Sequence, residues 1–392
     1  MPTRTLALLL LATFFTPAVF GQTIFHDSFE ESCLLDNDND RLMNCEEPQY
    51  GTLMDDPDTD DDGLLDGDEA LGTLGGLDLP ALGANPRHKD IFIEYDWFED
   101  SIGTGSGTCG SVGPHSHRPS QESLDIVTNL FASAPIENPD GLPGISVIHD
   151  AGQGGLFNGG SLVPDPDGEI IGTVFDAEYD SFYETQFAQN RHGYFHYVLM
   201  PHRFISPQGT TTYSGNAEIY GPRVDEIIVS LQCSATTSFT GNTIAHELGH
   251  NLRLLHGGDT GCNWKPNYKS IMNYRYQFYG VSSQCENLIF VGPAEFSTGS
   301  RIPLDEGALL ETSGMCGSPP IDWNTNGTIE SGTVAFDVNY YQGQSAECGS
   351  ELSVLTDHDD WASLDIPIDE PPDGSGGSTP PLGTECAPPP YP

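Results

Sequence analysis

The sequence predicts an α/β fold built on a twisted, mostly parallel sheet, and two observations support this prediction. Between residues 89 and 256, stretches with strand composition alternate with stretches that carry apolar residues at helical spacing. Strands separated by helices favour parallel pairing, because a parallel neighbour is reached through a crossover and not through a tight turn. After residue 256, periodic stretches are few while Gly, Pro and Cys are frequent, so we expect an irregular lower part that contains disulfides.

The expected elements follow in order along the chain. Strands are expected where Ile, Val, Phe and Tyr are concentrated, at residues 90–97, 144–149, 194–200 and 226–231. A helix is expected at residues 119–131, where apolar side chains recur three or four residues apart behind a proline near the first turn. A second helix is expected from about residue 243 to 252, with Thr240 or Asn242 as its N-cap.

Residues 1–21 are typical of a secretory signal peptide, with a basic start, an apolar run and small residues at the end. The apolar run is too short to cross a membrane, and no other run of about 18 apolar residues occurs. Nine cysteines follow residue 21, a number that suits an oxidising compartment. We therefore expect a secreted protein without a membrane span, extracellular or, in a bacterium, periplasmic.

The net charge of −45 at pH 7 argues against nucleic acid and anionic lipid as partners, because so acidic a surface repels them. Much of this charge is arranged in two twelve-residue loops with oxygen donors at positions 1, 3, 5, 9 and 12, which are ligand positions of an EF-hand-type calcium loop. The expected calcium ligands are Asp36, Asp38, Asp40, Asn44 and Glu47 in the first loop, and Asp58, Asp60, Asp62, Asp66 and Glu69 in the second.

Gly63 stands at position 6 of the second loop, where the turn is sharp, whereas Arg41 replaces that glycine in the first. The pair of loops resembles thrombospondin type-3 calcium repeats, since no long helices are expected beside them. The alternative is a disordered acidic linker, because this many carboxylates repel one another without calcium.

The strongest chemical motif is H-E-x-x-H, formed by His246, Glu247 and His250. On a helix, positions i and i+4 project from one face, so the two imidazoles can converge on one metal ion. Glu247 lies beside them and can reach a water on that metal. Two histidines on Zn²⁺ with a glutamate as general base are the zinc-hydrolase use of this motif. His256 and a Ser-Ile-Met-Asn-Tyr stretch at residues 270–274 follow.

The longer pattern resembles the metzincin clan of zinc metalloproteases, whose motif is H-E-x-x-H-x-x-G-x-x-H followed by a Met-turn. The resemblance implies a metzincin-like catalytic domain, with zinc held by His246, His250 and His256. It also implies that Met272 forms an apolar floor under the metal, which suits its flexible thioether. Tyr274 would ligate zinc or hydrogen-bond the oxyanion, and the other interpretation is a packed aromatic.

Arg253 stands where the clan has glycine, and this departure bears on the third ligand. If the helix continued to His256, that side chain would lie about 15 Å along the axis from His246 and could not share the metal. We expect Arg253 to end the helix in the left-handed conformation, at a cost on the order of 1 kcal/mol. Asp259 is the alternative third ligand if the turn is built differently.

Two further sets of residues leave the interpretation open. His115 and His117 alternate like a ligand pair, but the Gly and Pro residues around them favour a loop. No ligand spacing links five other histidines, His88, His149, His192, His196 and His202. The cysteine pairing cannot be read from the sequence, although pairs that would enclose a short segment are Cys262 with Cys285 and Cys33 with Cys45.

These observations predict a secreted zinc endopeptidase that acts on a protein or peptide substrate, with Glu247 as general base. Its cofactors would be one catalytic Zn²⁺ and structural Ca²⁺. The alternatives are a calcium-dependent adhesion or matrix-binding protein with an inactive metalloprotease fold, and a zinc hydrolase of non-peptide bonds. We make no prediction of oligomeric state. The expected segments are the signal peptide, the calcium-binding region, the catalytic domain and a Pro/Gly-rich tail, at residues 1–21, 22–88, 89–370 and 371–392.

Overall fold

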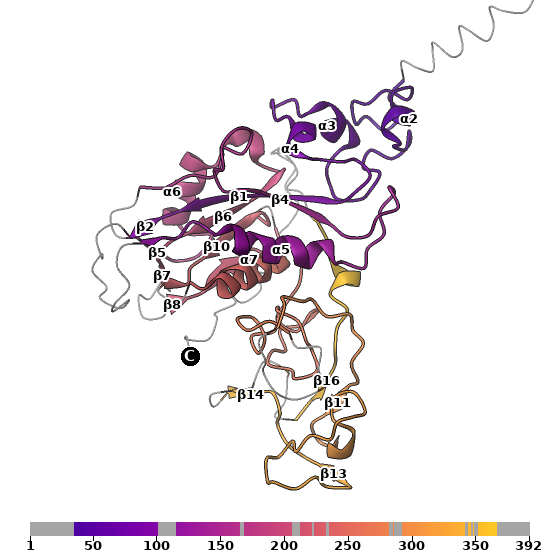
Figure 1. Cartoon of the computed structure of the whole chain (residues 1–392), viewed down its shortest axis with the longest axis vertical. Coiled ribbons are helices and arrows are strands. Elements are labelled where there is room, and N and C mark those ends of the chain that lie inside the picture. Colours follow the sequence, from indigo (N-terminus) through magenta and orange to yellow (C-terminus); the bar gives the residue numbers. More distant parts are fainter. Residues whose placement is uncertain are drawn as a thin grey trace, which may run out of the picture.

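The computed structural model has three parts, an acidic N-terminal region, an α/β layer structure and an irregular lower part (Figure 1). The expected signal peptide, the expected tail and Cys33 lie outside the residues that the structure describes. The described residues are 35–100, 115–164, 168–205, 212–221, 223–232, 235–281, 285, 292–341, 344–345, 348 and 352–366.

A five-stranded sheet with the order β4-β1-β6-β10-β9 forms the centre. Its parallel strands are β1 (Asp90–Trp97), β4 (Ser146–Asp150), β6 (Phe195–Met200) and β10 (Glu226–Val229). These are the four strands expected from composition, and the prediction of a mostly parallel sheet is confirmed. The fifth strand, β9 (Gly215–Ala217), pairs antiparallel with β10 at one edge. It was not expected, since three residues carry no readable period.

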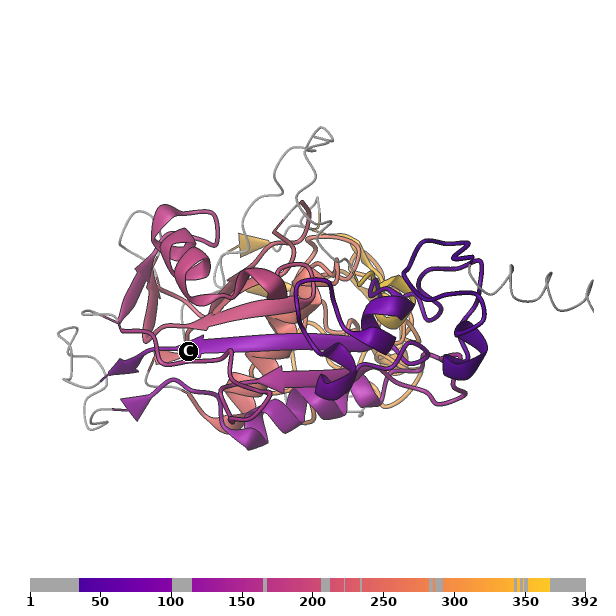
Figure 2. The ribbon, with the colours of Figure 1, turned by 90° about the horizontal axis from the view of Figure 1, so that it is seen from above.

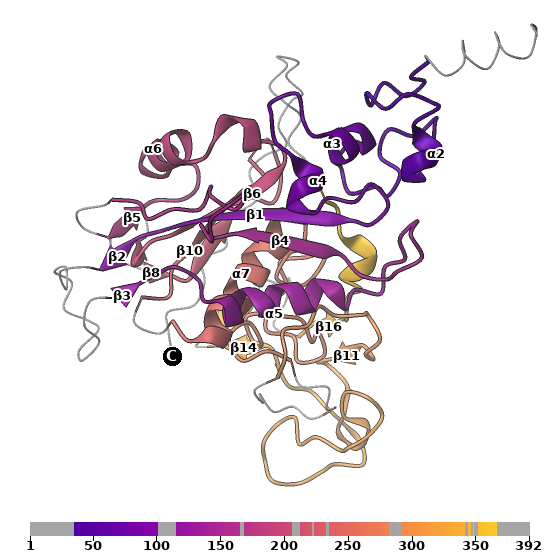
Figure 3. The same ribbon diagram turned by 45° about the horizontal axis from the view of Figure 1, so that its top comes forward.

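Helices cover both faces of the sheet (Figure 3). On one face α5 (Gln121–Ala132) and α7 (Thr237–Asn251) contact each other and share an apolar core with Ile91 and Ile93 of β1. On the other face Phe92 packs with residues of α4 (Leu79–Leu82) and α6 (Ala177–Gln186). Successive side chains of β1 therefore point to opposite faces and both are buried, as expected for a central parallel strand.

The helix that carries the H-E-x-x-H motif begins earlier than expected. α7 starts at Thr237 and not near residue 243, and its N-cap is Thr236, whose side chain accepts a hydrogen bond from the backbone N–H of Phe239. Neither Thr240 nor Asn242 caps it, because both lie inside the helix. The first two turns are rich in Thr, Ser and Gly, which are weak helix formers, so packing against α5 and not local propensity extends the helix.

The acidic region contains two short helices, α2 (Glu47–Tyr50) and α3 (Asp66–Leu71), each at the end of one acidic loop. It lies at the end of the sheet where β1 begins (Figure 2).

The smaller sheets are β5 (Glu169–Ile171) with β7 (Arg203–Ile205) and β8 (Thr212–Tyr213), β2 (Glu99–Asp100) with β3 (His115–Ser116), β11 (Leu304–Asp305) with β16 (Val354–Leu355), β12 (Leu309–Leu310) with β13 (Thr333–Val334), and β14 (Tyr340–Tyr341) with β15 (Gln344–Ser345).

The lower part is irregular and contains disulfides, as predicted. Its strands have two residues each, and a small apolar cluster around Trp323 forms its core. The disulfides join Cys262 to Cys348 and Cys285 to Cys316. The suggested pairing of Cys262 with Cys285 is therefore wrong, because the chain folds back on itself and brings distant segments together. Among the described residues, no helix is long and apolar enough to cross a membrane.

Candidate metal centre

α7 and the loop after it bring His246, His250 and His256 together. One ring nitrogen of each lies within 4.8 Å of those of the other two. The ring centroids are 4.8 Å apart for His246 and His250, 5.4 Å for His246 and His256, and 4.9 Å for His250 and His256. All three side chains are buried. Two histidines come from one face of the helix, and the third comes from the chain that turns back.

The turn at Arg253 makes this possible. Arg253 has φ 74°, in the left-handed region, and its N–H donates to the carbonyl of His250 at 2.9 Å. Its guanidinium donates to the carbonyl of Ile219 at 2.8 Å and lies over the ring of Tyr220. These contacts offset the strain of a non-glycine residue at positive φ. The structure does not bring Asp259 to the histidines, since its side chain is 65% exposed and lies near His358.

Two backbone carbonyls orient the helical imidazoles. Nδ1 of His246 donates to the carbonyl of Ile271 at 2.7 Å, and Nδ1 of His250 donates to that of Leu254, also at 2.7 Å. Because a carbonyl only accepts, the proton of each neutral ring lies on Nδ1 and the lone pair on Nε2. This second hydrogen bond is the usual way in which a metal-ligating histidine is oriented.

The imidazoles are neutral and their lone pairs are available to a cation. Burial lowers the pKa of His250 to about 4, and burial with the neighbouring imidazoles lowers the pKa of His246 and His256 well below the usual range. The Nε2 atoms of His250 and His256 are buried and have no hydrogen-bond partner among the described residues. A buried unsatisfied nitrogen is costly, and a metal ion at the meeting point of the three rings would satisfy both.

Glu247 lies between the helix and the edge of the sheet. Its side chain is buried, and burial raises the pKa of its carboxyl well above the usual range. Gly215 of β9 packs directly against this carboxylate, so that a Cβ at position 215 would overlap it. β9 therefore runs beside the only acidic residue of the motif. Sequence reasoning missed this contact because it did not predict β9.

Residues 270–274 pack beside this group of histidines. Met272 is fully buried, and its sulfur packs against Gly249, which lies between the two helical histidines in sequence. The ring centroid of Tyr274 lies 4.0 Å from that of His256 and 5.7 Å from that of His246. The structure thus places Tyr274 beside two of the imidazoles and Met272 against α7 at Gly249.

The acidic loops form three groups of carboxylates with oxygens within 4.8 Å of one another, namely Asp36 with Asp38 and Asp40, Asp58 with Asp60 and Asp62, and Asp62 with Glu69 and Asp90. Two expected carboxylate ligands, Glu47 and Asp66, lie outside these groups. The side chain of Asn44 accepts from the N–H of Asn37, the carboxylate of Asp66 accepts from Thr59, and that of Glu47 accepts from the hydroxyl of Thr52.

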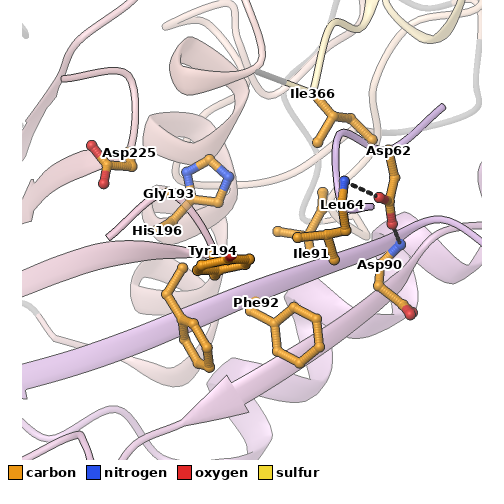
Figure 4. Close-up of a pocket in the computed structure, with 11 residues that line it drawn as sticks. Asp62, Leu64, Asp90, Ile91, Phe92, Gly193, Tyr194, His196, Asp225 and Ile366 are labelled. Atoms are coloured by element: carbon orange, nitrogen blue, oxygen red, sulfur yellow. Dashed lines mark hydrogen bonds between the residues drawn. The ribbon is translucent and has the colours of Figure 1, made fainter. Parts of the chain in front are cut away.

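Asp90, the first residue of β1, was missed because it lies outside both twelve-residue loops. Asp62 accepts hydrogen bonds from the N–H groups of Asp90 at 2.6 Å and Leu64 at 2.8 Å (Figure 4). Both carboxylate oxygens of Glu69 and of Asp60 are buried without a hydrogen-bond partner in the described part of the chain. A group of buried carboxylates in which several oxygens have no hydrogen-bond partner fits a hard divalent cation.

Desolvation and mutual repulsion act on all of these carboxyls. Burial, followed by the charge of nearby aspartates, raises the pKa of Asp60 to about 7 and that of Glu69 to about 11, and burial raises that of Asp90 to about 7. Without a cation, these shifts favour the protonated form of the carboxyls.

Comparison with known proteins adds no assignment to these sites. No protein-family model matches the chain, and no curated protein matches it.

Proposed function

We propose that the protein is a secreted, zinc-dependent endopeptidase. The observation that supports this most is the buried group of His246, His250 and His256 beside Glu247. Three neutral imidazoles suit Zn²⁺ and leave a coordination position open, which is the donor set of catalytic zinc sites. Secretion is inferred from residues 1–21 and from the disulfides, which persist in oxidising compartments.

The residues of the centre divide the chemistry between them. Bound zinc would supply a Lewis acid that polarises the scissile carbonyl and makes a water acidic. Glu247 takes the proton of the attacking water and delivers it to the leaving amine. This exchange requires a carboxyl that both accepts and returns a proton beside the open metal position. Tyr274, packed on His256, is assigned to stabilising the oxyanion of the tetrahedral intermediate.

A peptide substrate is favoured by the place of β9. This strand is the outermost in the sheet order, and Gly215 on it touches the carboxylate of Glu247. The edge of a sheet can pair with an extended peptide through backbone hydrogen bonds. A peptide held in this way would run past the general base, which is the arrangement that an endopeptidase needs.

We also propose that Ca²⁺ binds the acidic loops, with Asp90 as a ligand from the sheet. The donors there are all oxygens, which Ca²⁺ prefers and Zn²⁺ does not. An ion held by Asp62, Glu69 and Asp90 would join the loop region to the first residue of β1.

The peptidase is tested with Glu247→Gln, a change of nearly equal size. We expect the variant to keep its zinc, because no ligand is removed, and to hydrolyse casein about 10²- to 10⁴-fold more slowly, because the general base is lost. Zinc content by mass spectrometry and the release of peptides are the measurements. Glu218→Gln, the same change at a half-buried residue after β9, is the matched control and should remain active. An active Glu247→Gln enzyme would rule out the mechanism.

A further inference from the structure

A second group of histidines lies at the other end of the sheet from the acidic loops. His115 and His117 come from β3 and the residue after it, and His202 follows the end of β6. One ring nitrogen of each lies within 4.8 Å of those of the other two. His117 and His202 are buried, and His115 is half-buried. The sequence contains no spacing that would predict an approach of His202 to His115 and His117.

The dimensions of this group match those of the α7 centre. Its ring centroids are 4.7 Å apart for His115 and His117, 5.3 Å for His115 and His202, and 5.0 Å for His117 and His202. Each pair of rings is inclined by 63° to 69°. Three rings inclined equally to one another form a propeller, and each can direct one nitrogen to a common point. This is the arrangement of three ligands in a tetrahedral site.

Hydrogen bonds to the backbone hold the two histidine segments in place. The N–H of His117 donates to the carbonyl of Phe98 at 3.0 Å, and the N–H of Phe98 donates to that of Met200 at 3.1 Å. The hydroxyl of Ser230 donates to the carbonyl of His202 at 3.1 Å. The β2–β3 pairing fixes the segment of His115. The imidazoles therefore project from backbone that is already positioned, so little conformational entropy would be lost on metal binding.

We propose that His115, His117 and His202 bind a second transition-metal ion of the zinc class. Three imidazole nitrogens without carboxylate oxygens favour Zn²⁺, Cu²⁺ or Ni²⁺ over Ca²⁺ and Mg²⁺. Nε2 of His117 and Nδ1 of His202 now share one proton across 2.9 Å. Tetrahedral ligands at about 2.1 Å from zinc are about 3.4 Å apart, so binding requires this pair to open slightly. The ring that donates moves its proton to its other nitrogen, and no net proton is released.

The surroundings can complete the coordination. A cavity of about 140 Å³ borders His117 and extends to Met200, Thr236 and Thr240 at the start of α7. It has room for several water molecules, one of which can serve as the fourth ligand. A metal here would tie the β2–β3 pair to the end of β6, far along the chain from the H-E-x-x-H motif.

Zinc stoichiometry of the full mature chain tests this inference, in a background that removes the α7 centre. His246→Gln/His250→Gln should still bind about one zinc ion per chain on titration with zinc chloride, followed by mass spectrometry and by Co²⁺ absorption. Adding His202→Gln should remove that ion. Adding His88→Gln, a histidine outside both groups, should leave it in place and is the matched control.

His115→Gln is a second test. Because His115 is only half-buried, its substitution should disturb the packing of the fold less than substitution of His117 or His202. It should weaken zinc binding in the same background by at least about tenfold, at an unchanged circular dichroism spectrum. The inference is overturned if the His246→Gln/His250→Gln protein takes up no zinc, or if His202→Gln and His115→Gln leave its uptake unchanged. These readouts do not involve proteolysis, so a chain without peptidase activity can still give either result.

Discussion

Arg253 shows how one backbone conformation creates a three-histidine group. A helix that continued past this residue would carry His256 away from His246, and φ 74° at Arg253 turns the chain back. The conformation costs on the order of 1 kcal/mol for a residue with a Cβ. The hydrogen bond to Ile219 and the stacking on Tyr220 compensate for that cost.

The third ligand is tested by comparing two substitutions. We expect His256→Ala to weaken zinc affinity sharply, because a three-ligand site loses a third of its protein donors. Asp259→Ala should change it little, since its side chain is exposed and lies near His358. Competition with a chelator of known affinity measures both. A larger loss for Asp259→Ala than for His256→Ala would show that the ligand assignment is wrong.

Gly215 is expected to be indispensable to catalysis for a steric reason. Any Cβ there would overlap the carboxylate of Glu247, so Gly215→Val must move β9 or the base. A displacement of about 1 Å at a catalytic group can cost about 10²-fold in rate, and we expect a loss of at least that size in kcat with zinc retained. Gly332→Val, the same change at a glycine with no atom within 4 Å of its Cβ position, is the control. A fully active Gly215→Val enzyme would contradict the proposed position of the base.

At the scale of elements, the contact between α5 and α7 depends on a small residue. A Cβ on Gly241 would lie 2.6 Å from the carbonyl oxygen of Ser123 and 2.8 Å from Cβ of Ile126. Glycine inside a helix is normally unfavourable by about 1 kcal/mol relative to alanine. Here close approach of the two helices outweighs that preference, which also explains why the helical pattern was hard to recognise in this segment.

Gly241→Ala should therefore destabilise the protein, against the trend of helix propensity. We expect a loss of about 1–3 kcal/mol in the free energy of unfolding, the usual cost of overpacking. Ser238→Ala lies in the exposed first turn of the same helix and should be neutral or slightly stabilising. Urea denaturation of both variants gives the comparison. A stabilised Gly241→Ala protein would mean that the helices separate without cost.

At the scale of the whole molecule, Asp90 joins the acidic region to the sheet. Its N–H binds Asp62, and its carboxylate belongs to the same group as Asp62 and Glu69. A cation there would affect both parts, because β1 is the central strand that pairs with β4 and β6. Loss of the ion should therefore lower the stability of the sheet as well as that of the loops.

Calcium should raise the melting temperature of the protein, and Asp90→Asn should reduce that rise by at least half. The reason is that a ligand of the folded state at free concentration L stabilises it by RT ln(1 + L/Kd), and the variant raises Kd. Asp61→Asn removes the same charge from an exposed residue that belongs to none of the groups and tolerates its φ of 60° as asparagine. Equal melting temperatures with calcium and with chelator would contradict the proposed site.

Local pattern was sufficient for much of the fold and for part of the site. β1 spans the expected residues 90–97, because strand composition and burial are properties of a short segment. The same holds for His246 and His250, which are one helical turn apart wherever the helix lies. Their approach to each other could therefore be predicted from spacing, and the left-handed turn at Arg253 followed from the resemblance to a known motif.

The sequence by itself determined the central strands, the pair of histidines on one face of α7 and the acidic loops. Only the tertiary structure decided that β9 covers Glu247, that Asp90 joins the loops, and that Cys262 pairs with a cysteine 86 residues away. It also decided that His117 meets His202 across 85 residues. The physical reason is that two residues so far apart in the chain meet only when all the elements between them pack correctly. A short stretch of sequence does not contain that information.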